Sequence, residues 1–220
     1  MYKYIIVILL GVGLSVLVSS FSYTQKKRVI FFGDSITELG VKENGYITLL
    51  RPKLGEDKFE LIGKGISGNK IYDLYLRLKS DVLDLKPNVV VIYIGINDVW
   101  HKNLLKTGTD YDKFLRFYQA LINEIKLNGS EVIICTPTVI GELKSNANEM
   151  DAELNKYSEG IRQLAVKNQL KLADLRSLFN QYIAENNAQN TSKNILTYDG
   201  VHLNNVGNSV LADYFAKILN

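Results

Sequence analysis

Residues 28–33 read "RVIFFG" and run directly into "DSIT" at 34–37, and this stretch decides the fold. The β-branched and aromatic run has no polar alternation, which is typical of a strand buried on both faces. It stops at Gly33, Asp34 and Ser35, small residues that favour turns. The sequence therefore predicts a buried strand that ends at a serine, where Asp34 or Ser35 can also cap a following helix.

Strand-like and helix-like segments alternate after this first run. Four more strands are predicted, at "KFELIG" (58–63), "NVVVIYIG" (88–95), "EVIICTP" (131–137) and, less clearly, "LKLADL" (170–175). Helices are predicted at 111–129, 151–169 and 206–220; in the first, Phe114, Phe117, Leu121, Ile125 and Leu127 recur near helical spacing. Apolar strands alternating with helices indicate one α/β domain over residues 26–220, with a parallel sheet covered on both faces.

The bulk properties narrow the choice of partners and sites. The hydrophobic share of 46% is ordinary for a globular protein, and a net charge of +3 with scattered basic residues gives no reason to expect nucleic acid. Cys135 is the only cysteine, which excludes an intrachain disulfide and a multi-cysteine metal site. Because it lies in a predicted core strand, we expect a buried, inert thiol.

Residues 1–25 differ from the rest of the chain. One lysine, an apolar stretch over 5–18 and the small residues Ser20 and Ser22 predict an export signal, with no following cysteine for a lipid anchor. The apolar stretch is shorter than the ~18 residues expected of a membrane-spanning helix. We expect an exported protein, periplasmic or extracellular, after cleavage. The basic cluster at 26–28 favours the alternative, an uncleaved N-terminal anchor as the only membrane contact.

In an open parallel sheet, ligands bind at the carboxyl ends of the strands. Four predicted loops meet there, namely "GDSIT" (33–37), "GKGISGNK" (63–70), "GINDVWHK" (95–102) and "TPTVIGE" (136–142). Each is rich in small polar residues, which ordinary turns also use. Together they are the place to look for a site.

A nucleophilic serine needs a base, and the chain has two histidines. His202 lies in "TYDGVHLNNVG" (197–207) with Asp199 three residues before it, so one short loop can present both side chains. His101 also falls at the sheet edge, and Asp98 is its only acidic neighbour in the sequence. The spacing favours His202 without excluding His101.

Acyl transfer also requires donors that face the oxyanion of the tetrahedral intermediate. The backbone N–H of Ser35, at the start of a helix, is one natural donor. Gly68 can expose another because it has no Cβ, and Asn97 can supply a side-chain N–H. Three loops would then meet on one carbonyl oxygen.

The motifs "GDSIT", "SGN", "GIND" and "DGVHLN", in this order over residues 33–204, resemble the four blocks of the SGNH hydrolases, also called GDSL-type esterases and lipases. The resemblance implies a flavodoxin-like three-layer α/β/α sandwich with a five-stranded parallel sheet, and no metal or organic cofactor. It implies that Ser35 is the nucleophile, that His202 is the general base and acid, and that Asp199 orients His202. Gly68 and Asn97 would complete the oxyanion hole with the Ser35 amide.

The resemblance also gives roles to neighbouring residues. Asp34 and Asp98 match motif positions that hold loops by hydrogen bonds, and His101 becomes a loop residue without a chemical role. Trp100, the only tryptophan, is expected to contact substrate as a pocket wall, the alternative being a packing anchor at the sheet edge. The segments 99–110 and 138–151 are expected to be substrate-contacting insertions.

The implied function is that of a serine esterase that hydrolyses small esters through an acyl-enzyme, with a lysophospholipid or another short or single-chain acyl ester as substrate. A carbohydrate O-acetylesterase of the same fold is the alternative. A catalytically silent glycan- or lipid-binding protein is disfavoured because it needs no complete triad. A flavodoxin-like nucleotide or flavin binder is disfavoured because no phosphate-binding glycine motif is present, and "GKGISG" precedes only a short predicted helix.

Overall fold

The computed structural model describes residues 25–220. The export signal or anchor expected at residues 1–25 lies, apart from its last residue, outside the described residues. In the described part of the chain, none of the helices combines the length and the apolar character needed to cross a membrane.

The core of the fold is a five-stranded sheet in the order β2-β1-β3-β4-β5, and every neighbouring pair is parallel. The strands are β1 (Lys27–Gly33), β2 (Phe59–Gly65), β3 (Val89–Tyr93), β4 (Glu131–Cys135) and β5 (Lys171–Ala173). This is the flavodoxin-like strand order, whose direction of winding reverses between β1 and β3. The predicted fold class is confirmed.

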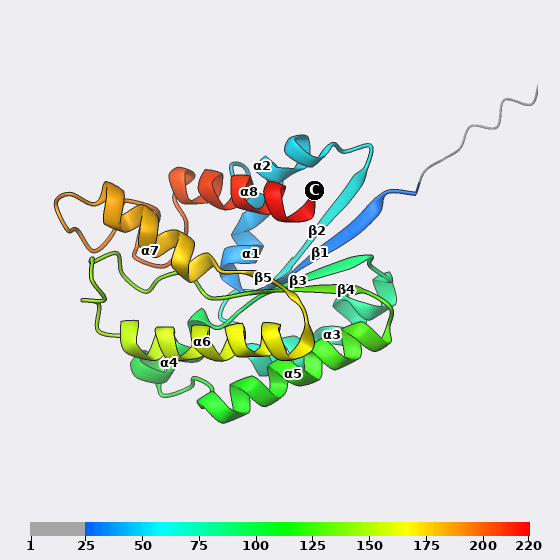
Figure 1. The fold of residues 1–220 in the computed structure, drawn as a ribbon, viewed down its shortest axis with the longest axis horizontal. Coiled ribbons are helices and arrows are strands. Elements are labelled where there is room, and N and C mark those ends of the chain that lie inside the picture. The colour runs from blue at the N-terminus through cyan, green and yellow to red at the C-terminus, as the bar shows by residue number, and fades with distance from the viewer. Residues whose placement is uncertain (1–24) are drawn as a thin grey trace, which may run out of the picture.

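Helices cover both faces of the sheet (Figure 1). On one face lie α1 (Ser35–Gly40), α2 (Tyr46–Leu54) and α8 (Asn205–Leu219); on the other lie α3 (Ile71–Asp81), α5 (Tyr111–Leu127) and α6 (Asp151–Asn168). The remaining helical elements are η1 (Leu83–Leu85), α4 (Ile96–Leu105) and α7 (Leu175–Asn186). Two helical layers explain why the central strands carry apolar side chains at successive positions.

Packing of β1 shows how these layers close on the sheet. Val29, Ile30, Phe31 and Phe32 are all inaccessible to solvent, because alternate side chains point into opposite helical layers. The Phe31 ring meets Phe215 of α8 edge to face, with centroids 5.2 Å apart. The strand that carries the candidate serine is therefore held from both sides.

The predicted strands all exist, with shifted bounds: β1 and β2 are each one residue longer than predicted, β5 has three residues, and β3 ends at Tyr93 rather than Gly95. The prediction that Leu127 belongs to the apolar face of α5 is wrong, since it is 82% exposed. Leu127 follows the buried Ile125 by two positions, which is roughly 200° around a helix. The helix after β2, expected to be short, is the 11-residue α3.

Candidate active site

Ser35 is the first residue of α1, directly after the capping residue Asp34. The Asp34 Oδ1 atom accepts a hydrogen bond from the Ile36 amide at 3.0 Å, so capping falls to Asp34 and the Ser35 hydroxyl remains free for other partners. Burial raises the pKa of Asp34 to about 7, against the opposing effect of that hydrogen bond. Gly33 before it is required, because a Cβ there would lie 2.3 Å from the Tyr93 carbonyl oxygen of β3.

Three side chains form a hydrogen-bonded row. The Ser35 Oγ lies 2.9 Å from Nε2 of His202, and Nδ1 of the same ring lies 2.7 Å from Oδ2 of Asp199. In the neutral imidazole whose Nδ1–H donates a hydrogen bond to Asp199, the Nε2 lone pair faces the serine hydroxyl. This is the arrangement in which a histidine can take the proton of an attacking serine.

The loop between α7 and α8 supplies both Asp199 and His202. The other oxygen of Asp199, Oδ1, accepts from the backbone amides of Val201 and His202 at 2.9 and 2.7 Å, which fixes the carboxylate within its own turn. Partial burial acts to raise the pKa of Asp199, but the hydrogen bonds from the His202 ring and backbone outweigh it and lower that pKa below its ordinary value. Asp199 is therefore ionised at neutral pH, as an orienting carboxylate must be.

The three groups expected to donate to an oxyanion follow the ends of three strands, β1, β2 and β3. In the part of the chain that the structure describes, the amides of Ser35 and Gly68 donate to no other protein group. The buried Asn97 gives one side-chain N–H to the Asn69 carbonyl oxygen at 3.0 Å, which leaves the second free. Gly68 has a φ of +78°, a left-handed conformation that glycine adopts without strain.

Arg77 of α3, which the sequence does not single out, ties these loops together. Its guanidinium donates to the Gly33 carbonyl oxygen at 2.7 Å and to Oδ1 of Asn69 at 2.8 Å, and it stacks over the Phe32 ring at 4.5 Å. It also reaches the Lys64 carbonyl oxygen. One side chain thus links the ends of β1 and β2 to the loop that carries Gly68.

Glu142 fixes the loop that carries Asp199 and His202, as Arg77 fixes the loop that carries Gly68. The sequence analysis did not single it out either. It is fully buried in the loop after β4, and its carboxylate accepts from the amides of Ile195, Leu196 and Thr197 at 2.7–2.8 Å and from the Thr197 hydroxyl. That hydroxyl in turn accepts from the Gly200 amide at 3.1 Å. The start of the loop that presents Asp199 and His202 is therefore fixed to Glu142, whose partners are more than 50 residues away in sequence.

His101 lies nearby, but within the described residues it has no carboxylate partner like that of His202. Its Cε1 atom is 3.9 Å from the position a Cβ on Gly68 would take, so it stands beside the oxyanion loop. Asp98, its sequence neighbour, is buried and uses Oδ1 to accept from the Ile71 amide at 3.2 Å. Partial burial and then the Lys70 ammonium hold the pKa of His101 below its ordinary value. A mostly neutral ring with no carboxylate partner in the described chain is poorly suited to act as the base.

Two aromatic rings flank His202. Tyr198, missed by the sequence analysis, stacks on the imidazole with centroids 5.8 Å apart and is half exposed, while Trp100 meets it edge-on at 6.3 Å. A cavity of about 310 Å³, which Trp100 helps to line, opens between the loop after β4 and the loop that carries Asp199. Part of the segment 138–151, expected to contact substrate, lines this cavity.

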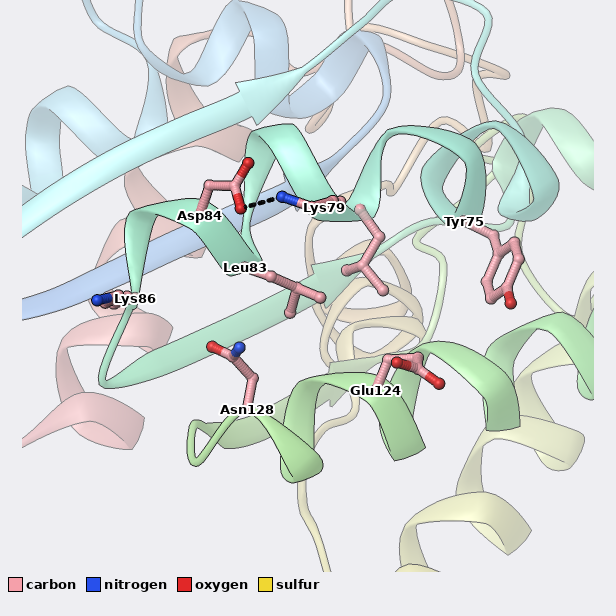
Figure 2. Close-up of a pocket in the computed structure, with 8 residues that line it drawn as sticks. Tyr75, Lys79, Leu83, Asp84, Lys86, Glu124 and Asn128 are labelled. Atoms are coloured by element: carbon pink, nitrogen blue, oxygen red, sulfur yellow. Dashed lines mark hydrogen bonds and ion pairs between the residues drawn. The ribbon is translucent and has the colours of Figure 1, made fainter.

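A larger cavity, of about 530 Å³, lies elsewhere, between α3, η1 and α5 (Figure 2). Lys79, Asp84 and Asn128 are among its lining residues. Because η1 and the end of α5 lead into the starts of β3 and β4, this cavity is at the opposite edge of the sheet. Among residues 25–220 there is no group of three or more His, Cys, Asp or Glu side chains arranged to hold a metal ion.

Comparison with known proteins places the chain among ester hydrolases. A profile of the GDSL-like lipase/acylhydrolase family matches residues 31–210. An acetylxylan esterase from Geobacillus stearothermophilus is 28% identical over 87% of this chain and 93% of its own length. The isoamyl acetate-hydrolyzing esterase 1 homolog of Rattus norvegicus is 26% identical over 88% of this chain and 81% of its own length.

Solved structures agree with these sequence matches. An acetyl xylan esterase designated AlAXEase superposes with a TM-score of 0.86 and 51% identity, covering 88% of this chain and all of that one. The acetylxylan esterase from Geobacillus stearothermophilus superposes with a TM-score of 0.75 and 27% identity, covering 89% of this chain and 94% of that one. Structures of that second enzyme include catalytic mutants in which a serine, an aspartate or a histidine is replaced by alanine.

Proposed function

We propose that this chain, which belongs to the GDSL-like lipase/acylhydrolase family, uses Ser35, Asp199 and His202 to cleave acetyl esters of carbohydrates. Hydrolysis of carboxylic esters is the activity of its relatives and of its family, and the chain is a serine esterase of the SGNH hydrolases. The observation that carries the assignment of residues is the row of hydrogen bonds from Asp199 through His202 to the Ser35 hydroxyl.

The first half of the reaction forms an acyl-enzyme. The Nε2 atom of His202 takes the hydroxyl proton as the Ser35 Oγ bonds to the acyl carbon, and the carbonyl oxygen becomes an oxyanion. The free N–H groups of Ser35, Gly68 and Asn97 donate to that oxyanion. The bond to the alcohol oxygen then breaks, and His202 returns the proton to the departing alcohol.

Water completes the cycle. His202 takes a proton from a water molecule that adds to the acyl carbon, the bond to the Ser35 Oγ breaks, and the serine recovers its proton as the carboxylic acid leaves. Asp199 stays ionised throughout and stabilises the imidazolium at each step. Because every group returns to its starting state, the cycle consumes only ester and water.

The substrate class rests on the relatives. Both acetylxylan esterases and the isoamyl acetate esterase homologue are named for acetyl esters, whereas none of these names refers to a lysophospholipid. We therefore prefer the carbohydrate acetyl ester, which the sequence analysis held as the alternative, to the lysophospholipid. An acyl-chain series of p-nitrophenyl esters separates the two: acetate should be the best substrate, and preference for chains of eight or more carbons would favour a lipid.

Loss of the nucleophile tests the residue assignment. We expect Ser35→Ala to remove p-nitrophenyl acetate hydrolysis and labelling by a fluorophosphonate probe. Ser80→Ala is the matched control, because Ser80 is exposed on α3 and away from the triad. Undiminished hydrolysis by a folded Ser35→Ala protein would overturn the assignment.

Export remains a proposal that rests on the sequence of residues 1–25. Expression of the full chain in a bacterium, followed by fractionation and N-terminal sequencing, tests it. A soluble exported protein that begins after about residue 20 supports cleavage. An intact N-terminus in the membrane fraction supports the anchor.

A further inference from the structure

We propose that the cavity beside Trp100 is the leaving-group subsite, and that it binds the neutral sugar ring or rings from which the acetyl group is cleaved. This inference rests on the proposed function, because it concerns the alcohol half of the same ester. It identifies a binding site on the loop after β4, outside the four motif blocks. It also identifies which half of the substrate the protein selects.

The location of the cavity gives the first argument. The alcohol oxygen of the substrate must reach the Nε2 atom of His202, because that atom returns the proton to it. Trp100 meets the His202 ring edge-on and also lines the cavity, and Asp199 and Val201 line it as well. The cavity thus lies beside the Asp199–His202 end of the triad without including the His202 ring, and its lining includes neither Ser35 nor the oxyanion donors Gly68 and Asn97.

The lining has the chemistry of a sugar site. Trp100, Ile140 and Met150 provide apolar surface against which the C–H face of a pyranose can pack, while Ser192 provides a polar side chain for its hydroxyls. The carboxylates of Asp199 and Glu149 also line it, with no lysine or arginine among the lining residues. An anionic leaving group, such as the phosphate-bearing headgroup of a lysophospholipid, would be repelled there.

The two walls are held together before substrate arrives. Glu142 joins the loop after β4 to residues 195–197, and the Gly141 amide donates to the Gly200 carbonyl oxygen at 2.8 Å. Together these contacts fix the separation of the two loops that enclose the cavity. A preformed site of this kind loses little conformational entropy on binding.

The outer wall is fixed as well. Asn148 accepts from the Leu143 amide and donates to its carbonyl oxygen, both at 3.1 Å, and it donates to the Asp151 carboxylate at 2.8 Å. Asp151 forms a buried ion pair with Arg176 at 2.6 Å, and both side chains are at most 3% exposed. The turn that carries Ala147 therefore projects from a rigid base.

Filling the cavity from its exposed rim tests the proposal. Ala147 is exposed and lines the cavity. The indole of Ala147→Trp should therefore occupy the cavity without disturbing the packing of the core. Ala184→Trp, at an exposed position of α7 outside the cavity lining, is the matched control. Each protein is assayed on acetylated xylo-oligosaccharide and on ethyl acetate, whose leaving group is too small to fill the cavity.

We expect Ala147→Trp to lower kcat/KM on the oligosaccharide at least tenfold and to leave ethyl acetate hydrolysis within about twofold of wild type, with Ala184→Trp unchanged on both. An unchanged rate on the oligosaccharide, or an equal fall on both substrates, would overturn the subsite. Ethyl acetate activity also reports that the variant is folded. Failure of the proposed function is distinct, since the wild-type protein itself would then not hydrolyse the oligosaccharide.

Discussion

The two histidines of the chain lie at the same edge of the sheet, both next to Trp100, in contrasting surroundings. His202 has a carboxylate at 2.7 Å on one nitrogen and the serine hydroxyl at 2.9 Å on the other. His101 makes no such bond within the described residues, and burial together with Lys70 disfavours its charged form. Position at the carboxyl ends of the strands is therefore insufficient to make a base.

The surroundings of His202 differ from those of His101 in the hydrogen bonds that fix the loop carrying the imidazole. The loop of His202 is fixed by Asp199 within its own turn and by Glu142 from the loop after β4. Asp98 is the acid that the sequence offers as a partner for His101, and its carboxylate accepts instead from the Ile71 amide of α3. The same types of residue thus perform chemistry in one region and hold the backbone in the other.

Replacement of each histidine by alanine is the strongest test of this contrast. We expect His202→Ala to lower kcat on p-nitrophenyl acetate by about 10⁵-fold, because the serine then has no proton acceptor. His101→Ala should stay within about threefold of wild type, since a general base is worth far more than a neutral neighbour of the oxyanion loop. Comparable losses in the two variants would break the comparison.

Removal of the carboxylate charge from Asp199 should have the next largest effect. In Asp199→Asn the side chain can no longer stabilise the imidazolium, and we expect kcat to fall by about 10⁴-fold with KM little changed. Asp112→Asn, at an exposed position of α5, is the control. A loss of less than tenfold would mean that the contrast with His101 does not depend on the carboxylate.

The lowered pKa of Asp199 gives this variant a pH signature. A carboxyl group whose pKa is lower in the folded state contributes stability above its unfolded pKa and loses it as the pH falls through the folded value. Melting temperatures of wild type and Asp199→Asn should therefore differ at pH 7 and converge below about pH 4. A difference that persists in acid would contradict this reading.

Replacement of Glu142 should lower kcat less than replacement of a triad residue, and more than replacement of an exposed acid. A glutamine there offers one acceptor oxygen and two unwanted donors to the amides of residues 195–197, so Glu142→Gln should displace the His202 loop. We expect kcat to fall roughly 10- to 100-fold, with the fluorophosphonate labelling rate falling in parallel. Glu185→Gln, exposed on α7, is the control, and equal activity of the two variants would remove Glu142 from the network.

Asp98 gives the smallest effect and tests the His101 side. Burial raises the pKa of Asp98 to about 7, so the folded state holds its proton more tightly than the unfolded chain. The cost of the buried charge is therefore absent below about pH 4, grows between pH 4 and 7, and is complete above. Asp98→Asn keeps an acceptor for the Ile71 amide, and we expect it to be more stable than wild type at pH 8 by roughly 1 kcal/mol or more.

Thermal melts of both proteins at pH 5 and pH 8 provide the measurement. The wild type should lose more stability between these two values than Asp98→Asn, although Asp34 still titrates in both. A variant that is less stable than wild type at pH 8 would show that the Asp98 carboxylate is stabilised by its neighbours rather than penalised by burial.

Local sequence patterns predicted the parallel sheet and its two helical layers from apolar runs and their connections, whereas the flavodoxin-like topology came from the resemblance to the SGNH hydrolases. "RVIFFG" and "NVVVIYIG" are buried on both faces, and the strand-end motifs lie at one sheet edge as expected. Leu127 was placed wrongly because it follows Ile125 by two positions, and residues two positions apart do not share one face of a helix.

Residues that act through distant partners could not be found in this way. Glu142 and Arg77 look like ordinary charged residues in the sequence, and only the fold brings residues 195–197 to one and Gly33 to the other. Tyr198 was adjacent to a recognised motif, and an aromatic residue directly before Asp199 was the one local signal available. The cavity lies between two loops about 50 residues apart in the sequence, and no periodicity in the sequence predicts that they are neighbours.

Trp100 is the only tryptophan in the chain; it lies next to both histidines and lines the cavity. The tryptophan fluorescence of this protein therefore originates from a single indole at the candidate active site. Emission intensity should respond to protonation of the adjacent imidazoles and to a sugar entering the cavity. Substrate binding can then be followed in an unlabelled Ser35→Ala protein, where turnover no longer consumes the ligand.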